Sequence, residues 1–245
     1  SNRSTIKNYR LAYNHCTPLY DMNMADIRTY HMQSVIDNCP GYQTAQRVKI
    51  LCNQLYRWCL KHDCIKKNYA ESLIVTIKND PKEKTAFSSA EIQLLWQQVN
   101  QNEFIPLILM LIYSGVRINE LLLLEKSEVH LEEQWFRVKD SKTKAGRRVV
   151  PIADKVLPFW YSFVQKSQCK YAVCNINGEQ LTYDNFRKNY WAPLMKQLNL
   201  HHTPHETRHT CISQLVMRDV NQTIIKKIVG HKSSMSLTEK VYTHI

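Results

Sequence analysis

The sequence predicts a mainly α-helical protein with two domains, the second of which adds a small β-hairpin or sheet. Three observations predict this class. Apolar residues recur at helical spacing over much of the chain, a polar charged run near residue 80 interrupts them, and two short apolar segments later flank a polar turn. A chain of 245 residues is also long enough to form two domains that each bury a core.

The amino-terminal region is expected to be all helical. Residues 4–77 contain apolar and aromatic positions at helical spacing, most clearly in residues 49–60. The pair Pro40-Gly41 separates this helix from an earlier one that holds Met24 to Ile36.

A linker is expected at residues 79–86. This stretch begins in a polar, charged run that contains a proline and has no hydrophobic period. The predicted domains are therefore a helical domain at 1–78 and a second domain at 87–245.

The second domain carries clear signals for the start and end of several elements. Ser88-Ser89-Ala90-Glu91 has the pattern of a capping box before an apolar helix. The further expected elements are a buried helix Phe104–Tyr113 that stops at Ser114-Gly115, a helix Ile118–Leu124 directly after Arg117, a hairpin of Trp135–Val138 and Arg147–Ile152 around Gly146, a helical region from Thr182 onward, and a helix Gln222–Val229 between Asn221 and Gly230.

The charge of the chain predicts a polyanionic partner. Thirty-three Lys and Arg residues against 21 Asp and Glu give a formal net charge of +12. Nucleic acid is the first expectation and an anionic membrane surface the second. The sequence has no apolar run of the roughly 20 residues that span a bilayer, and its first ten residues lack the apolar core of a signal peptide. We expect a cytoplasmic protein with no membrane partner.

The eight cysteines do not predict a metal site or disulfides. None of them forms a C-x-x-C pair, and reduced thiols are the more usual state in a basic chain of this length. The first residues, Ser1-Asn2, are typical of the remnant of a cut expression tag, so an amino-terminal part is expected to be missing.

The segment from Tyr113 to Leu122 is a candidate anion site. Gly115 breaks the chain, and Arg117 follows at the first turn of the next helix, where free N–H groups and the helix dipole favour an anion. A guanidinium there can grip two oxygens of one phosphate. The alternative is a surface arginine that pairs with Glu120.

The turn of the predicted hairpin is strongly basic. Residues 139–148 contain five cations and one anion. This composition fits a solvated turn, and it also fits a finger that contacts the DNA backbone or a groove. Lys142 or Lys144 could reach into a site as a proton donor.

The sequence HETRH at residues 205–209 matches the H-E-x-x-H pattern of zinc proteases. Pro204 precedes it directly, which places His205 at the first turn of a helix, and no further histidine ligand follows at metalloprotease spacing. We therefore expect no zinc. At spacing three, His205 and Arg208 lie on one helix face and can point to the same anion.

Residues from distant segments can complete such an anion site. Arg117 and Arg208 could neutralise the two non-bridging oxygens of a phosphodiester. His231, just past the end of a predicted helix, adds a donor, and Tyr242 lies in a polar stretch where a core role is less obvious.

Taken together and in this order, these segments resemble the tyrosine recombinases, or phage-type integrases. The helical region before residue 79 and the linker also resemble the family's core-binding domain, by pattern rather than by motif. The resemblance implies that residues 87–245 form an α+β tyrosine-recombinase catalytic domain. The matching motifs are Ser114–Leu121, Ser141–Thr143 with Val149–Pro151, Thr203–Thr210, Val229–Ser234 and Tyr242–His244.

The resemblance implies a catalytic set that works without metal or cofactor. It assigns the first of two nearby lysines as general acid, leaves His209 as a structural helix residue, and makes Glu120 a brace for the Arg117 segment. By this resemblance Tyr242 is the nucleophile, and Lys142 is the general acid. Arg117, Arg208 and His231 bind the phosphate. His205 assists proton transfer at the nucleophile.

The implied function is site-specific DNA recombination or integration through a 3′-phosphotyrosyl intermediate, as the integrase of a phage or conjugative transposon. The implied partners are double-stranded DNA and three further copies, which form a homo-tetramer on two DNA sites in the bacterial cytoplasm or nucleoid. The alternatives are a type IB topoisomerase-like enzyme, a DNA-binding regulator without catalysis, and a zinc peptidase. The separate helical domain favours recombination over relaxation, and the complete catalytic set disfavours a regulator.

Overall fold

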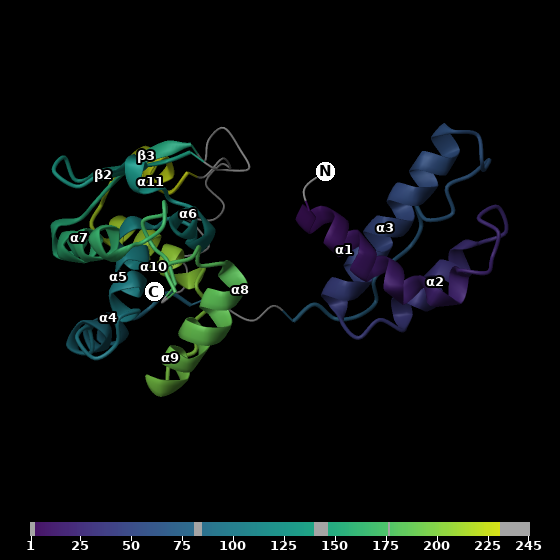
Figure 1. Ribbon diagram of the computed structural model, residues 1–245. Helices are drawn as coiled ribbons and strands as arrows, with labels where there is room; N and C mark the ends of the chain where they lie inside the picture. Colours follow the sequence, from purple (N-terminus) through teal and green to yellow (C-terminus); the bar gives the residue numbers. More distant parts are fainter. Residues whose placement is uncertain (1–2, 81–84, 140–146, 176, 231–245) are drawn as a thin grey trace. The chain divides into compact units, whose positions relative to one another are not determined.

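The computed structural model describes residues 3–80, 85–139, 147–175 and 177–230. The chain divides into two compact units, Ser1–Lys82 and Glu83–Ile245. In the described residues, the first unit has helices and no strand, and the second unit adds one three-stranded antiparallel sheet to a mainly helical body (Figure 1). The predicted fold class is confirmed.

The first unit is built around one long helix. Buried residues of α2 and α3, among them Met32, Ile36, Val48 and Tyr56, share one hydrophobic core, and α1 also packs on α3. As expected, Pro40-Gly41 lies between α2 and α3. The elements are α1 (Arg3–Tyr13), the 3-10 helix η1 (Asn14–Leu19), α2 (Thr29–Asp37) and α3 (Tyr42–Lys61).

The expectation of helix through residue 77 is wrong, because α3 ends at Lys61. The segment after α3 is irregular, and side chains of the helices satisfy its backbone. Asn53 donates to the carbonyl oxygen of Ala70 at 2.9 Å, and the Thr29 hydroxyl donates to that of Tyr69 at 2.7 Å. Leu73 is buried in the core of the unit, so the segment packs without continuing the helix.

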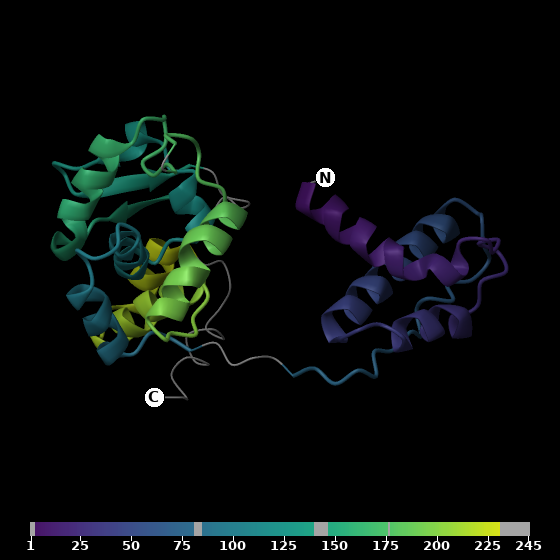
Figure 2. The same ribbon diagram turned by 60° about the horizontal axis from the view of Figure 1, so that its bottom comes forward.

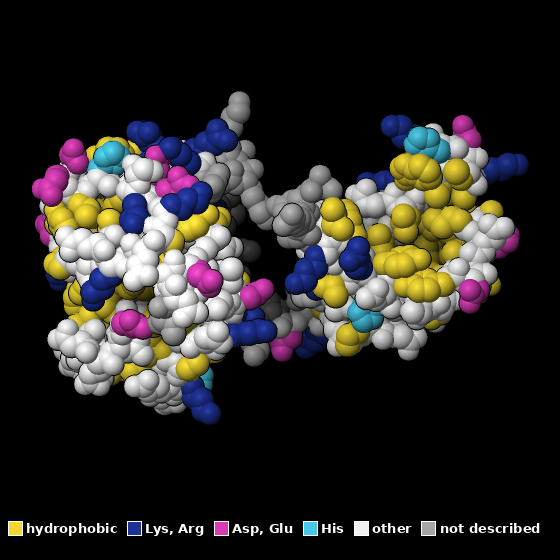
Figure 3. Space-filling view, viewed as in Figure 1, with side chains coloured by type: hydrophobic (Ala, Val, Ile, Leu, Met, Phe, Trp, Pro, Cys, Tyr) yellow, Lys and Arg dark blue, Asp and Glu magenta, His cyan; other side chains and the backbone are white. Residues whose placement is uncertain are grey.

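The first unit also exposes large hydrophobic side chains. Figure 3 shows such side chains gathered over the visible face of this unit. On α3, Ile50 and Trp58 are exposed, whereas Leu51 and Cys59 are buried. This helix therefore presents apolar residues both to the core and to solvent.

The second unit surrounds a helix that is buried along almost its whole length. This helix, α5, lies in the middle of the unit in both views (Figures 1 and 2). The helical elements are α4 (Ser89–Gln97), α5 (Ile105–Ser114), α6 (Ile118–Leu122), η2 (Lys126–Glu128), η4 (Asp154–Val156), α7 (Leu157–Lys166), α8 (Tyr183–Asn185), the π-helix η5 (Phe186–Trp191), α9 (Ala192–Gln197), α10 (Glu206–Met217) and α11 (Gln222–Val229).

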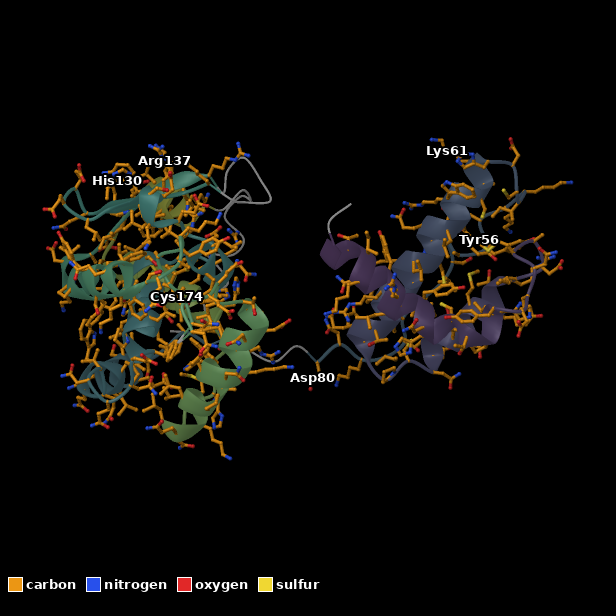
Figure 4. The ribbon with its side chains drawn as sticks, in the orientation of Figure 1. Tyr56, Lys61, Asp80, His130, Arg137 and Cys174 are labelled. Carbon is orange, nitrogen blue, oxygen red and sulfur yellow. The ribbon has the colours of Figure 1, made fainter. Side chains whose placement is uncertain are left out.

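The sheet covers one side of this unit and has the order β1-β2-β3. Its strands are β1 (Val129–His130), β2 (Trp135–Val138) and β3 (Arg148–Pro151). The buried Phe136 pairs with the buried Val150, whereas the exposed Arg137 and the half-buried His130 lie on the other face of the sheet (Figure 4). The predicted hairpin is thus present, and α11 packs against β3.

The predicted start of α4, the end of α5 and both limits of α11 agree with the structure, whereas the helix predicted at Ile118–Leu124 ends at Leu122. Ser88 Oγ accepts from Glu91 N at 3.2 Å, and Glu91 Oε2 accepts from Ser88 N at 2.7 Å, which is a complete capping box. Asn221 Oδ1 accepts from Thr223 N at 2.8 Å. Gly115 and Gly230 end α5 and α11 with φ of 64° and 67°, a region that favours glycine.

Within the described ranges, no helix combines the length and the apolar character that crossing a membrane requires.

Candidate active site

A cluster of three arginines lies where the end of α5, the start of α6, α10, the end of α11 and β3 meet. Packing of α10 on α5 and α11, and of α11 on β3, brings these elements together. The arginines are Arg117, Arg148 and Arg208, and a single glutamate, Glu120, contacts two of them. We call these four residues the arginine cluster.

Arg117 is the residue before the first turn of α6. Gly115 turns the chain out of α5, and α6 begins three residues later. The backbone N–H of Arg117 donates to Glu120 Oε2 at 2.9 Å, and its Nη1 donates to Oε1 at 2.8 Å. Because 40% of the Arg117 side chain stays exposed, the ion pair with Glu120 leaves the guanidinium open to a ligand.

Arg208 is buried inside the unit. Its Nη1 donates to the carbonyl oxygen of Gly115 at 3.0 Å and to that of Val229. Its Nη2 is buried and has no hydrogen-bond partner in the described part of the chain. Burial lowers the pKa of Arg208 to about 10, and the nearby charges of Arg117 and Arg148 act in the same direction. The guanidinium nevertheless remains charged at neutral pH.

Arg148 joins the cluster from β3. Its Nη2 lies 2.9 Å from Glu120 Oε2, its Nη1 lies 3.3 Å from Oε1, and its Nε donates to the carbonyl oxygen of Ile228 at 2.5 Å. Only 6% of its side chain is exposed. In the sequence, Arg148 belongs to the basic turn, and no role in the site was predicted for it. No local motif signals this contact, because only the fold brings β3 next to α6.

The cluster has an excess of positive charge. In the described residues, Glu120 is the one carboxylate with an ion pair to these arginines, and it pairs with Arg117 and Arg148 but not with Arg208. Burial raises the pKa of Glu120, but hydrogen bonds and charges from Arg148 and Arg117 outweigh it and hold this pKa below its ordinary value. An additional anion would be stabilised here, most strongly one with several oxygens.

The HETRH segment starts α10. His205 is the N-cap residue, and its ring meets that of His209 edge-on at 5.1 Å between centroids. The Glu206 carboxylate accepts from Thr203 N at 2.5 Å and lies 3.4 Å from His202 Nδ1. The Glu206 side chain therefore binds a backbone N–H group that lies just before α10. No group of three or more potential metal ligands is present among the residues that the structure covers.

Three predicted site residues lie outside the described ranges: Lys142, His231 and Tyr242. The alternative general acid, Lys144, lies outside them too. Of the other predicted residues, the structure brings Arg117 and Arg208 together through Gly115, and it places His205 at the start of the helix that carries Arg208.

The chain is similar to known proteins over much of its length. The model of the phage integrase family matches residues 86–245, more than half of the chain. A tyrosine recombinase of Thermosipho africanus is 27% identical over 56% of this chain and 48% of its own length. A XerC-like tyrosine recombinase of Caldanaerobacter subterraneus is 22% identical over 93% and 70%. The chain spans about half the length of several of the curated relatives it matches.

Solved structures share the fold. The Tn1549 transposon integrase in complex with a circular intermediate DNA has a TM-score of 0.84 at 16% identity, covering 100% of this chain and 90% of that one. A lambda integrase tetramer bound to a Holliday junction has a TM-score of 0.79 at 16% identity, covering 96% and 74%. With the family model matched over the arginine cluster and the regions around it, the chain belongs to the phage integrase family.

Proposed function

We propose that this chain is a tyrosine recombinase that cleaves and rejoins double-stranded DNA through a 3′-phosphotyrosyl intermediate, as the integrase of a phage or a conjugative transposon. The observation that carries the proposal is the arginine cluster. Arg208 is buried, and its Nη2 has no hydrogen-bond partner among the described residues. Arg117, which follows the Gly115 turn that Arg208 binds, is partly exposed. Such a pair suits a phosphate diester, whose two non-bridging oxygens carry the charge.

The proposed reaction is an in-line displacement at phosphorus. The phenol oxygen of Tyr242 forms a bond to phosphorus, and the bond from phosphorus to the 5′ oxygen breaks. His205 assists removal of the phenol proton, and Lys142 gives a proton to the 5′ oxygen. Rejoining runs the same steps in reverse with another strand's 5′-hydroxyl. A phenol with a pKa near 10 needs this help at neutral pH.

The arginines supply the electrostatic part of catalysis. Negative charge builds on the non-bridging oxygens as phosphorus becomes five-coordinate, and fixed guanidinium groups stabilise it without reorganising. In the proposal Arg117 and Arg208 take this role, and His231 donates a further hydrogen bond. The backbone bonds from Arg208 to Gly115 and Val229 hold its guanidinium in place before DNA arrives.

The surface next to the cluster suits a DNA backbone. Lys and Arg side chains gather on the sheet side of the second unit (Figure 3). Arg137 in β2, Lys139 directly after β2 and Arg147 directly before β3 are exposed. DNA affinity that depends on such contacts falls steeply as the salt concentration rises.

We assign residues 1–78 to a core-binding domain, 79–86 to a linker and 87–245 to a catalytic domain.

We further propose that the working assembly is a homo-tetramer on two DNA sites in the bacterial cytoplasm or nucleoid. Recombination of two duplexes needs four cleaved strands, and each chain has one Tyr242. The solved lambda integrase tetramer on a Holliday junction is consistent with this assembly.

A covalent trapping experiment tests the function. A random duplex pool is first selected for binding to the chain, and the selected duplexes are then made with a nick next to each candidate bond, so that the cleaved end diffuses away. The chain is incubated with them in EDTA. We expect a covalent protein–DNA adduct that Tyr242→Phe abolishes, and sequencing its DNA end identifies the target.

Other outcomes point to the alternatives. Tight binding to the selected DNA without an adduct contradicts the proposal and favours a DNA-binding regulator. An adduct that depends on added metal contradicts the proposed chemistry. Relaxation of supercoiled plasmid by a monomer, with no strand exchange between two sites, favours a topoisomerase.

A second substrate tests the general acid. When sulfur replaces the 5′ bridging oxygen, the leaving group needs no proton. Lys142→Ala should therefore cleave this substrate at nearly the wild-type rate and the ordinary substrate far more slowly. If Lys144→Ala shows that pattern and Lys142→Ala does not, Lys144 is the general acid.

A further inference from the structure

We propose that Arg148 is a positioning residue of the active site, which shares the charge of Glu120 with Arg117 and fixes the end of α11. This inference rests on the proposed function. Arg148 itself is not placed to bind DNA, because its side chain is almost fully buried and each of its three nitrogens already has a protein acceptor.

Glu120 divides its charge between two arginines. Both of its oxygens accept from both arginines: Oε1 from the two Nη1 atoms, and Oε2 from the Arg117 backbone and from Arg148 Nη2. A carboxylate that shares its charge between two guanidinium groups holds Arg117 in place without fully neutralising its charge. Without Arg148, the full charge of Glu120 would act on Arg117 and compete with a phosphate for its guanidinium.

Arg148 also binds the carboxyl-terminal end of α11. The last turn of a helix leaves carbonyl oxygens without partners, and cations there are favourable. Arg148 Nε donates to the carbonyl oxygen of Ile228, and Arg208 donates to that of Val229. Two buried arginines thus cap the end of α11, directly before the segment that carries His231.

Gly230 completes this arrangement. A Cβ on Gly230 would lie 2.8 Å from Arg148 Nη1 and 3.0 Å from its Cδ and Cζ. The guanidinium therefore packs directly on the backbone of the residue that precedes His231. Arg148 is in contact with the backbone at both Ile228 and Gly230, and through Glu120 it also reaches Arg117.

A burst experiment on the selected nicked duplex distinguishes an effect of Arg148 on active-site geometry from an effect on folding. At saturating DNA, the amplitude of adduct formation reports the folded fraction, and the rate constant reports the geometry of the folded site. We expect Arg148→Met to keep the amplitude and DNA affinity while its rate constant falls by about 10²-fold, the size of effect that small misplacements of catalytic groups produce. Arg148→Lys, which keeps the charge but loses the planar fork, should be intermediate.

Arg218→Met is the matched control, since it removes an exposed arginine at the end of α10. We expect it to leave the rate constant within about 3-fold of wild type, as surface substitutions usually do. In the double variant, the losses in rate constant from Glu120→Gln and Arg148→Met should be less than additive, because Arg148 acts partly through Glu120.

The outcomes are distinct. If wild type forms no adduct, the proposed function fails. If wild type forms the adduct and Arg148→Met matches Arg218→Met in rate constant, the positioning role fails. If Arg148→Met lowers only the amplitude, in parallel with its melting temperature, Arg148 is structural and the inference is overturned.

Discussion

Arg208 donates a hydrogen bond of 3.0 Å to the carbonyl oxygen of Gly115, ninety-three positions earlier in the chain. This bond ties the first turn of α10 to the turn that precedes Arg117. One side chain therefore has two tasks, since it supplies positive charge to the site and holds the second arginine's segment in place.

Arg208→Lys separates these two tasks only in part. A lysine keeps the charge but cannot donate in two directions from one plane. We expect cleavage to fall by about 10²-fold or more, the loss typical for removing one fixed donor. Because buried hydrogen bonds to Gly115 and Val229 are also lost, stability should fall by about 1–3 kcal/mol.

Single-turnover cleavage and urea unfolding measure both effects, and Arg218→Lys on the exposed end of α10 is the control. DNA affinity should change little, because one buried contact is a small part of a phosphate-dominated interface. An equal loss of affinity and of cleavage would contradict a role in the transition state.

Glu120 should make the second unit sensitive to acid. Its folded pKa is below its ordinary value, near 4.3 in an unfolded chain. A depressed pKa contributes stability that is fully present above the unfolded value and is lost as pH falls through the folded one. We expect Glu120→Gln to lower the melting temperature at neutral pH and to flatten its decline below about pH 4.

Melting curves between neutral pH and about pH 3 follow this effect, and Glu133→Gln, an exposed change of the same charge, is the control. If the melting temperatures of Glu120→Gln and wild type fall equally with pH below about pH 4, the ion pairs with Arg117 and Arg148 are not the source of the acid sensitivity.

The sequence was sufficient for features whose causes lie within a few residues. The capping box at Ser88, the end of α5 at Gly115 and the limits of α11 at Asn221 and Gly230 depend on local backbone chemistry, and each is present. The pair of Arg117 and Glu120 is local in the same sense, at a spacing of three residues.

Features that depend on tertiary contacts were not predictable in this way. Arg148 reads as one more cation in a basic turn, and only the packing of β3 beside α6 and α11 gives it buried partners. Residues 62–77 contain enough apolar positions to suggest helix, yet side chains of α2 and α3 bind their backbone in an irregular path. The order of motifs gives the candidate site, whereas its internal bonding requires the fold.

Tyr56 tests whether the first unit unfolds on its own. Its hydroxyl donates to the carbonyl oxygen of Ile27 at 3.0 Å (labelled in Figure 4), and burial raises its pKa to about 12, so it remains a donor at neutral pH. Tyr56→Phe should cost about 1 kcal/mol, the usual net value of a buried hydrogen bond.

Hydrogen exchange read by mass spectrometry locates the effect. Amides in residues 29–61 should exchange faster, whereas those in residues 105–114 should not change, because the two units have separate cores. Tyr30→Phe is the matched control, as 67% of Tyr30 is exposed. Faster exchange in both units would show that their folding is coupled.

Gly230→Ala tests the contact between α11 and Arg148. Alanine at φ of 67° costs about 1–2 kcal/mol by itself, because its Cβ crowds the backbone in the left-handed region. The Cβ would also meet the guanidinium of Arg148 at 2.8 Å, and that group cannot withdraw without losing Glu120 and the carbonyl oxygen of Ile228. The total loss should therefore exceed the backbone cost.

A double-mutant cycle isolates the contact. In an Arg148→Ala background, Gly230→Ala should cost only the backbone part, so the two substitutions should be non-additive by about 0.5–3 kcal/mol. Urea unfolding followed by tryptophan fluorescence is suited to this measurement, because four of the five tryptophans belong to the second unit. Equal costs in both backgrounds would mean that backbone conformation alone requires glycine, and that Arg148 does not restrain the residue before His231.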